Sequence, residues 1–246
     1  MKKIAAIILA AGKGKRMSSR KINKVVISLG NKQMILHAID RLKELFITPI
    51  IVVVGFAKES VIKVLKDSVV FAHQSKRLGT AHAVLCALKK LPKDIDTVLV
   101  FNGDDSAFYT KDIIQNLIRS HLEKNTALSF LTITVDNPTG LGRVIRDSND
   151  RIAGIVEEKD ATSNEKKIKE INPACYIFKV SFLRQYLKKV KKSPISGEYY
   201  LTSLIDIAIK NKERLGAVTG GKILWRGINT PQELEEAEKL LCASDN

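Results

Sequence analysis

Runs of aliphatic residues alternate with segments of helical periodicity along most of this chain. Continuous apolar runs at 4–9, 50–54 and 97–101 have the length and β-branched content of strands buried on both faces. Between them, apolar residues recur every three or four positions, as on one face of a helix, at 34–46 and 111–122. This alternation predicts an α/β fold with a mostly parallel sheet flanked by helices. The same patterns predict helices at 58–66 and 79–91 and strands at 69–72 and 127–135.

The pattern changes after Pro138. Two short strands are predicted at 143–146 and 152–156, joined by the turn-forming residues 147–150, and the polar segment 158–169 predicts a loop. The remaining segments predict a strand at 175–180 and helices at 182–190, 199–210 and 232–241, the last introduced by Thr230 as N-cap and Pro231 in its first turn. We expect a single domain over 1–246 with a small β insertion.

Bulk composition fits this organisation. The 246 residues, of which 45% are hydrophobic, suit one α/β domain with a substantial core. No run approaches the roughly 18 apolar residues that span a bilayer. Cys86, Cys175 and Cys242 are odd in number and widely spaced, so they predict reduced thiols rather than a disulfide framework or a zinc site. We therefore expect a cytoplasmic protein with no membrane partner.

The net charge of +15 raises the question of nucleic-acid binding. However, lysine is scattered along the whole chain, and only 6% of residues are aromatic, which leaves little material for base stacking. Solvated lysine is the simpler interpretation, and no nucleic-acid partner is expected. The excess positive charge would still attract polyanionic substrates over long distances.

Residues 4–24 contain the most informative motif. The first apolar run ends in small residues at Ala10, Ala11 and Gly12, and a glycine-rich loop follows that carries Arg16 and Lys24. Small residues at the end of a parallel strand expose N–H groups to phosphate, and the cations lie within reach of the same charge. This predicts a nucleoside triphosphate site.

Two other interpretations of this stretch fit the residues less well. An export signal would share the basic start and the apolar run, but dense positive charge follows at once without a clear cleavage site. A P-loop is excluded because the loop lacks the G-x-x-x-x-G-K-[ST] spacing.

Acidic residues follow the predicted strand at 97–101. Asn102, Gly103, Asp104 and Asp105 would lie at the carboxyl edge of the sheet, where ligands of open α/β sheets bind. A carboxylate there suits Mg²⁺, which takes one or two carboxylates together with water and phosphate oxygens. The alternative is that Asp104 and Asp105 only form the turn and cap the next helix.

A second ligand-binding candidate opens the predicted helix at 79–91. The free N–H groups at Gly79 and the hydroxyl of Thr80 would bind a nucleobase or a phosphate, unless this is an ordinary helix start. His82 is expected to be a packed or supporting histidine, because nothing in this chemistry requires a general base.

Seven motifs in the same order resemble one family. They are LAAGKGKRM at 9–17, LGTAHAV at 78–84, GLGRVIRD at 140–147, IVEEKDAT at 155–162, IKEIN at 168–172, GEYYLT at 197–202 and RGINTPQEL at 226–234. The chain resembles the N-terminal pyrophosphorylase domain of bacterial N-acetylglucosamine-1-phosphate uridyltransferase over residues 4–241. The resemblance implies a Rossmann-like nucleotide-diphospho-sugar transferase fold, with a nucleotide-binding part at about 1–135, a sugar-phosphate part at about 136–230 and a C-terminal helix at 231–241.

The resemblance also implies a reaction and its residues. UTP and N-acetylglucosamine 1-phosphate would become UDP-N-acetylglucosamine and pyrophosphate, with Mg²⁺ as cofactor. Arg16, Lys24 and Asp104 would be catalytic, and Asp104 with Asn229 would hold the metal. The nucleotide set would be Leu9, Ala10, Ala11, Gly12, Gly14, Lys24, Gln74, Gly79, Thr80, Asn102 and Gly103. The sugar set would be Gly142, Glu157, Asn172, Tyr200 and Thr202.

The chain departs from the family pattern at several places. The usual Pro-Lys is replaced by Asn23-Lys24 in a loop one residue longer, and a glutamine expected beside the uracil is replaced by Arg77, which cannot accept a hydrogen bond. Pro173 and Ala174 replace Thr-Gly, and Asp105 adds a negative charge beside the expected metal. Hexapeptide repeats of a left-handed β-helix are absent from this sequence, so no acetyltransferase domain is expected, and the chain would be a monomer or a weak oligomer.

Two alternative functions stay open at this point. One is a related nucleotidyltransferase that uses CTP or dTTP with another sugar or polyol phosphate. The other is a degenerate, non-catalytic nucleotide binder, suggested by the charge and the altered loops.

Overall fold

The computed structural model describes residues 3–17, 21–104, 106–221, 225 and 227–244. Asp105, which the sequence placed beside a metal, and Arg226, which opens one of the family motifs, lie outside these described residues. Among the described helices, none combines the length and apolar character that crossing a membrane requires.

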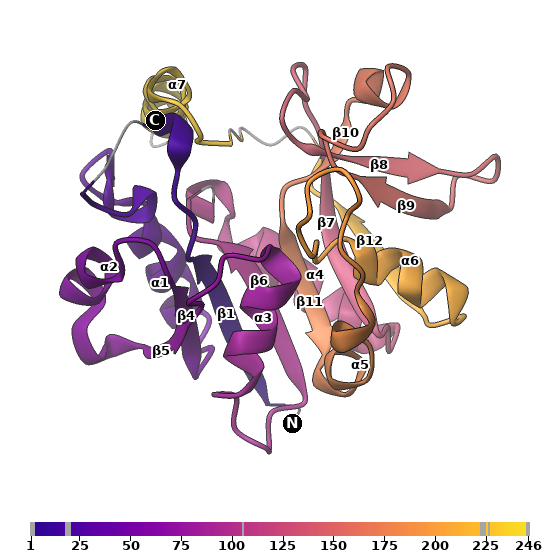
Figure 1. The fold of residues 1–246 in the computed structure, drawn as a ribbon, viewed down its shortest axis with the longest axis horizontal. Helices are drawn as coiled ribbons and strands as arrows, with labels where there is room; N and C mark the ends of the chain where they lie inside the picture. Colours follow the sequence, from indigo (N-terminus) through magenta and orange to yellow (C-terminus); the bar gives the residue numbers. More distant parts are fainter. Residues whose placement is uncertain (1–2, 18–20, 105, 222–224, 226, 245–246) are drawn as a thin grey trace.

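A ten-stranded mixed sheet forms the centre of the fold (Figure 1). Its order is β5 (Val70–His73), β4 (Ile50–Val54), β1 (Ile4–Ala10), β6 (Thr97–Asn102), β11 (Cys175–Lys179), β7 (Leu128–Thr134), β10 (Glu170–Asn172), β8 (Gly142–Arg146) and β9 (Ile152–Val156), with β12 (Leu215–Thr219) also paired to β7. β5, β4, β1 and β6 are parallel to one another, and β11 then pairs antiparallel with both β6 and β7. The expected α/β sheet flanked by helices is confirmed.

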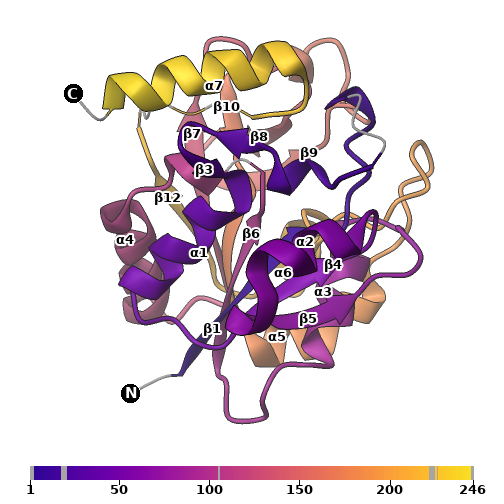
Figure 2. The same cartoon turned by 90° about the vertical axis from the view of Figure 1, so that its left-hand side faces the viewer.

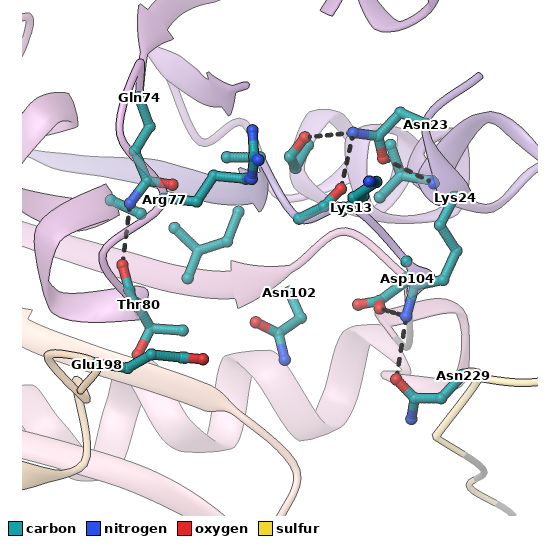
Figure 3. Close-up of a pocket in the computed structure, with 18 of the residues that line it drawn as sticks. Lys13, Asn23, Lys24, Gln74, Arg77, Thr80, Asn102, Asp104, Glu198 and Asn229 are labelled. Carbon is teal, nitrogen blue, oxygen red and sulfur yellow. Dashed lines mark hydrogen bonds and ion pairs between the residues drawn. The ribbon is translucent and has the colours of Figure 1, made fainter. Parts of the chain in front are cut away.

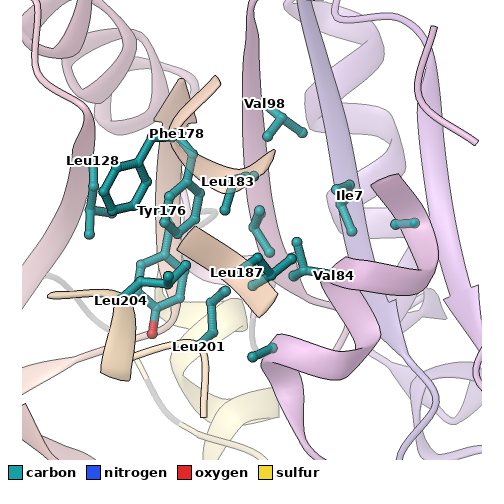
Figure 4. Packing of buried hydrophobic residues seen from close by; sticks show 14 of the residues in the cluster. Ile7, Val84, Val98, Leu128, Tyr176, Phe178, Leu183, Leu187, Leu201 and Leu204 are labelled. Carbon is teal, nitrogen blue, oxygen red and sulfur yellow. The ribbon is translucent and has the colours of Figure 1, made fainter. Parts of the chain in front are cut away.

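Helices cover both faces of this sheet. Side chains of β1 alternate between them, so that Ile7 packs in one hydrophobic core and Ile8 in the other. The first core contains α3 (Thr80–Leu88), α5 (Val180–Tyr186) and α6 (Ser203–Lys210) (Figure 4). The second contains α1 (Met34–Glu44), α2 (Lys58–Leu65), α4 (Lys111–Glu123) and part of α7 (Pro231–Ser244). Both faces of β1 are therefore inaccessible, and ligands must approach its end.

The C-terminal helix returns to the N-terminal half of the fold. α7 lies across the top of the molecule, at the end opposite the N-terminus (Figure 2). A Cβ built at Gly30, after the short strand β2 (Ser28–Leu29), would lie 3.1 Å from Leu241 of α7. The helix begins as predicted: Thr230 accepts from Glu233 N–H at 3.2 Å, and the Glu233 carboxylate accepts from Thr230 N–H at 2.9 Å. This capping box fixes the segment that carries Asn229.

Several predicted boundaries were wrong. The predicted helix at 79–91 is α3 and ends at Leu88, and the one at 182–190 is α5 followed by a 3₁₀ turn at Leu187–Lys189. The short strands β2, β3 (Lys32–Gln33), β10 and β12 were not predicted, since two to five residues carry little periodic signal. The loop at 158–169 contains one 3₁₀ turn, Glu165–Lys167.

The largest correction concerns residues 199–202, which were predicted as the start of a helix. α6 begins only at Ser203, because the preceding backbone pairs with the segment at 78–81. Tyr199 N–H donates to Leu78 O at 2.8 Å, Ala81 N–H donates to Tyr199 O at 2.9 Å, and Leu201 N–H donates to the Thr80 hydroxyl at 2.8 Å. These bonds tie the start of α3 to the C-terminal half of the chain.

Gly79 is required for this close approach. Its backbone lies at φ 108° and ψ 177°, a conformation that only glycine adopts without strain, and a Cβ there would lie 2.5 Å from Tyr199 O. We expect Gly79→Ala to lower the free energy of unfolding by about 3 kcal/mol or more, since backbone strain of about 1–3 kcal/mol adds to the displacement of Tyr199. Urea denaturation measures the loss.

Gly197→Ala is the matched control for this prediction. Gly197 also has a positive φ of 71°, but among the described residues no atom lies within 4 Å of its Cβ position. Its substitution should therefore cost only the backbone strain, about 1 kcal/mol. Equal losses in the two variants would contradict the requirement for close contact at Gly79.

Candidate functional site

A cavity of about 680 Å³ opens at the carboxyl ends of β1 and β6 (Figure 3). Of the residues that the sequence assigned to a nucleotide or a metal, those that line it are Leu9, Ala10, Ala11, Gly12, Gly14, Arg16, Lys24, Gln74, Gly79, Thr80, Asn102, Asp104 and Asn229. Gly103 lies just behind them, where its N–H donates to Leu9 O at 3.0 Å. Four segments far apart in sequence thus meet in one cleft.

The loop after β1 is pinned by Asn23, a residue that sequence reasoning noted only as a departure. Its side chain is buried, and its Nδ2 donates to Ala10 O at 2.9 Å and to Phe56 O at 2.8 Å. Its Oδ1 accepts from Val25 N–H at 3.2 Å. A polar side chain with bonds on both sides of the loop holds Lys24 at a fixed place beside the cavity.

Lys24 is the central cation of the described cavity. Its side chain is buried, and its ammonium forms an ion pair with Asp104 and donates to Ile228 O at 2.7 Å and to Asn229 Oδ1 at 3.2 Å (Figure 3). An ammonium can only donate, so the oxygens of Asp104 and Asn229 must face it. The two residues predicted to hold a metal therefore do converge, on a resident positive charge.

The donor set suits a hard divalent cation. Carboxylate, amide and carbonyl oxygens surround one point, and such oxygens are the ligands that Mg²⁺ prefers. In the part of the chain that the structure describes, no group of three His, Cys, Asp or Glu side chains could hold a metal by itself. A metal here would need phosphate or water oxygens as further ligands. Asp104 does not cap α4, because Thr110 does so by accepting from Ile113 N–H.

Gln74 presents one acceptor at the other end of the cavity. Its Nε2 donates to Gly79 O at 3.0 Å and lies 3.0 Å from His82 Nδ1. Because a carbonyl oxygen only accepts, the amide nitrogen must face Gly79, and the amide oxygen is left toward the cavity (Figure 3). His82 is thus a supporting residue, as expected. Arg77, which the sequence placed beside the expected uracil as the replacement of a glutamine, also lines this cavity, as does Glu198, which the sequence assigned to no site.

Arg16 reaches the opposite wall of the cleft. Its side chain is exposed, and its Nη1 lies 3.8 Å from the Cβ position of Gly140, at the start of the motif around β8. The guanidinium therefore stands between the loop after β1 and the C-terminal half. Lys13, on the same loop, lies over the Phe56 ring at 5.9 Å.

The predicted sugar residues form a neighbouring group. Gly142 pairs with Asn172 across β8 and β10, and its Cβ position lies 3.5 Å from Glu157 Oε2. The Thr202 hydroxyl donates to Glu157 Oε1 at 2.8 Å. The Asn172 amide is engaged with the Tyr176 hydroxyl, and its oxygen accepts from Ala174 N–H at 3.1 Å. Four residues from different elements are thus brought together.

Tyr200 belongs to the turn between Tyr199 and Thr202, and partial burial raises the pKa of its phenol. None of the five predicted sugar residues lines the 680 Å³ cavity, although Thr80, which does line it, accepts a hydrogen bond from Leu201 N–H in the same turn as Tyr200 and Thr202. The structure therefore separates the cavity-lining set from a second polar set formed by Gly142, Glu157, Asn172, Tyr200 and Thr202.

The pKa values of two adjacent carboxyl groups, Glu157 and Glu158, are shifted in opposite directions. Desolvation raises the pKa of Glu157, although the hydrogen bond from Thr202 opposes this rise. For Glu158, burial works against ionisation, but hydrogen bonds from Arg143 and Gly140 lower the pKa. Neither Glu158 nor Arg143 was singled out from the sequence, although both lie inside the family motifs.

The family model described as nucleotidyl transferase matches residues 5–244. "Bifunctional protein GlmU" of Caldicellulosiruptor saccharolyticus is 43% identical over 98% of this chain, and that of Caldanaerobacter subterraneus is 39% identical over 98%. Each alignment covers 52% of the relative, so the chain spans about half the length of the curated relatives it matches.

A solved structure gives the same arrangement of elements. A Bacillus anthracis protein assigned as a glucose-1-phosphate thymidylyltransferase superposes with a TM-score of 0.80, covering 96% of this chain and 94% of that one. At 23% identity, this likeness shows the fold alone.

The raised pKa of Glu157 makes a prediction about stability. A carboxyl whose pKa is higher in the folded than in the unfolded state favours folding at low pH, and this contribution is lost as the pH rises through the folded pKa. We expect Glu157→Gln to melt at a higher temperature than the wild type at pH 8, with the difference vanishing near pH 4. Differential scanning calorimetry at both pH values measures this.

Glu165→Gln supplies a control of opposite sign. Hydrogen bonds from Thr162 lower the pKa of Glu165, so its stabilising contribution is present at neutral pH and is lost as the pH falls. This variant should therefore be less stable than the wild type at pH 8. A Glu157→Gln variant that melts below the wild type at pH 8 would contradict the desolvation argument.

Proposed function

The chain belongs to the nucleotidyl transferase family, and from this premise we propose that it transfers a uridylyl group from UTP to N-acetylglucosamine 1-phosphate, releasing pyrophosphate. The observation that best supports the proposal is the cavity in which Lys24, Asp104 and Asn229 meet at one end and Gln74 lies at the other. This arrangement suits a triphosphate at the first end and a base at the second. The choice of UTP and of the amino sugar rests on the seven family motifs.

The reaction needs alignment more than acid–base catalysis. A phosphate oxygen of the sugar phosphate attacks the α-phosphorus of UTP, and the bond to the bridging oxygen breaks as pyrophosphate leaves. The nucleophile is already ionised at neutral pH, so no general base is required. The chain's contribution would be to hold the two substrates in line and to neutralise charge on the leaving group. Arg16 and Lys24 would supply donors for this purpose.

Members of this family generally use a divalent metal, and we propose Mg²⁺ held by Asp104 and Asn229. When bound, the ion would neutralise triphosphate charge and hold phosphate oxygens in place. The Lys24 ammonium would then leave Asp104 and Asn229 and pair with a phosphate. The Lys24–Asp104 ion pair would thus be replaced by a Lys24–phosphate pair and a metal–Asp104 pair. The Ile228 carbonyl, which also accepts from Lys24, would be left to water.

The second polar set would hold the amino sugar. Glu157 and Asn172 offer oxygens for sugar hydroxyl and amide N–H groups. Gly142 would leave the space beside them open, since a Cβ there would lie 3.1 Å from Ile155 Cγ2 and 3.5 Å from Glu157 Oε2. Thr202 and Tyr200 follow the contact with Thr80 and would close this side. We further propose that residues 1–246 work as one nucleotidyltransferase domain in the cytoplasm, as a monomer or a weak oligomer.

A substrate panel tests this function. Purified protein is mixed with UTP, dTTP or CTP and with N-acetylglucosamine 1-phosphate, glucosamine 1-phosphate or glucose 1-phosphate in the presence of Mg²⁺, and pyrophosphate release is followed. We expect UTP with N-acetylglucosamine 1-phosphate to exceed every other pair in kcat/KM by about tenfold or more, since a polar contact to the correct base or acetamide is worth that much.

Faster turnover with dTTP or CTP would move the assignment to the related nucleotidyltransferases. Binding of UTP without pyrophosphate release from any pair would support a non-catalytic nucleotide binder instead. Arg16→Ala serves as the inactive control for the panel.

The resident ion pair of Lys24 generates a prediction about metal binding. Lys24→Met keeps the length of the side chain but removes its charge, leaving the Asp104 carboxylate without its cation. We expect the variant to bind Mg²⁺ without nucleotide about tenfold more tightly than the wild type, because the two ligand oxygens no longer share a positive charge. The rise in melting temperature with added MgCl₂ reports this without any turnover.

Asp104→Asn is the matched control, since it removes a ligand instead of the competing cation. It should show no Mg²⁺-dependent rise in melting temperature. If Lys24→Met responds to Mg²⁺ no more than the wild type does, Lys24 does not compete for the site.

A further inference from the structure

Arg143 is a buried residue of β8 that directly follows Gly142, a member of the second polar set. Its side chain is 1% exposed, and its Nη2 forms an ion pair with Glu158 Oε2 at 2.6 Å and donates to Lys166 O at 3.3 Å. Its Nη1 donates to Leu141 O. One guanidinium therefore joins the loop before β8, the segment after β9 and the 3₁₀ turn at Glu165–Lys167.

Each member of the ion pair is the next residue in sequence after one of the two residues proposed to contact the sugar. Arg143 comes after Gly142, and Glu158 comes after Glu157. Gly142 and Arg143 are neighbours on β8, so they face opposite sides of the sheet. Gly142 and Glu157 approach each other on one side, with 3.5 Å between the Gly142 Cβ position and Glu157 Oε2, and Arg143 and Glu158 are paired on the other. The Arg143–Glu158 ion pair would thus fix the distance between Gly142 and Glu157, the two residues proposed to face the sugar.

Glu158 also fixes the loop that meets Arg16. Its Oε2 accepts from Gly140 N–H at 3.1 Å, and Gly140 has a positive φ of 83°. The Cβ position of Gly140 lies 3.8 Å from Arg16 Nη1. A single carboxylate oxygen therefore connects the buried Arg143 to the loop against which the Arg16 guanidinium rests.

We propose that the Arg143–Glu158 pair positions the acceptor-sugar half of the active site against Arg16. The inference rests on the proposed function, because it assigns Gly142 and Glu157 to the sugar phosphate. Arg143 and Glu158 touch no substrate and act through Gly140, Gly142 and Glu157. A charged pair suits this task, because a buried guanidinium is costly to leave unpaired and therefore keeps Glu158 in one place. Its loss would loosen the sugar side and leave the base end, around Gln74, unchanged.

Glu158→Ala tests the proposal, with KM for each substrate measured separately at saturation of the other. We expect KM for the sugar phosphate to rise about tenfold or more, while KM for UTP changes by less than about twofold, since only one substrate loses its alignment. Glu158→Gln keeps an acceptor for Gly140 N–H and should lie closer to the wild type. Calorimetric titration with the sugar-nucleotide product and with UTP gives the same split without turnover.

Glu170→Ala is the matched control for lost stability. Glu170 forms a two-bond ion pair with Arg146 at 2.7 Å, also on β8, and its side chain is 23% exposed against 28% for Glu158. Its loss should lower the melting temperature and leave both KM values unchanged. Partial unfolding of Glu158→Ala would lower kcat but would not separate the two KM values.

Three outcomes would overturn the positioning role. They are an unchanged KM for the sugar phosphate in Glu158→Ala, an equal rise for both substrates, and the same split in Glu170→Ala. Wild-type protein that turns over no sugar phosphate would instead contradict the proposed function. If the wild type turns over a different sugar phosphate, the two KM values of Glu158→Ala are compared with that sugar phosphate in place of N-acetylglucosamine 1-phosphate.

Discussion

The buried ammonium of Lys24 is the charge around which the cleft is arranged. A cation with so little exposure is unfavourable unless oxygens surround it, and Asp104, Asn229 and Ile228 O provide them from two segments more than 100 residues apart. The loop after β1, the end of β6 and the start of α7 are therefore held together by one point charge. A polyanion that enters this cleft would compete with Asp104 for the Lys24 ammonium, so its binding would exchange one ion-pair partner of Lys24 for another.

The two halves of the chain are also joined beside the cleft. The hydrogen bonds between 78–81 and 199–201 hold the start of α3, which lines the cavity, against the turn that contains Tyr200 and Thr202. Glu158 connects the wall around β8 to the loop near Arg16. These two sets of contacts hold different parts of the cleft, which suits a reaction in which two phosphates must each be aligned.

The sequence predicted those features that local pattern determines. β4 and β9 match their predicted bounds, because continuous apolar runs with clear ends identify a strand. The cavity residues at the ends of β1 and β6 were accessible to the same reasoning, since parallel strands end at one edge of a sheet. Residues 199–202 were assigned wrongly because their apolar spacing resembles a helix while their N–H groups bond to a segment more than 100 residues away. β12 was missed for a similar reason: its Gly216 is a weak strand former, but the absence of a side chain there lets it pack against Ser129.

The exchange of proline for Asn23 shows how a departure in sequence can preserve a position in space. Asn23 has a φ of −72°, within the range that a proline ring imposes, so the backbone has the shape that the Pro-Lys pattern would give. Here, however, Asn23 N–H donates to Ser60 Oγ at 3.0 Å, a bond that proline cannot make, and its side chain bonds to Ala10 O and Phe56 O. Hydrogen bonds to the ends of β1 and β4 thus replace the covalent restraint of a ring. For this reason the longer loop still delivers the next residue, Lys24, to Asp104.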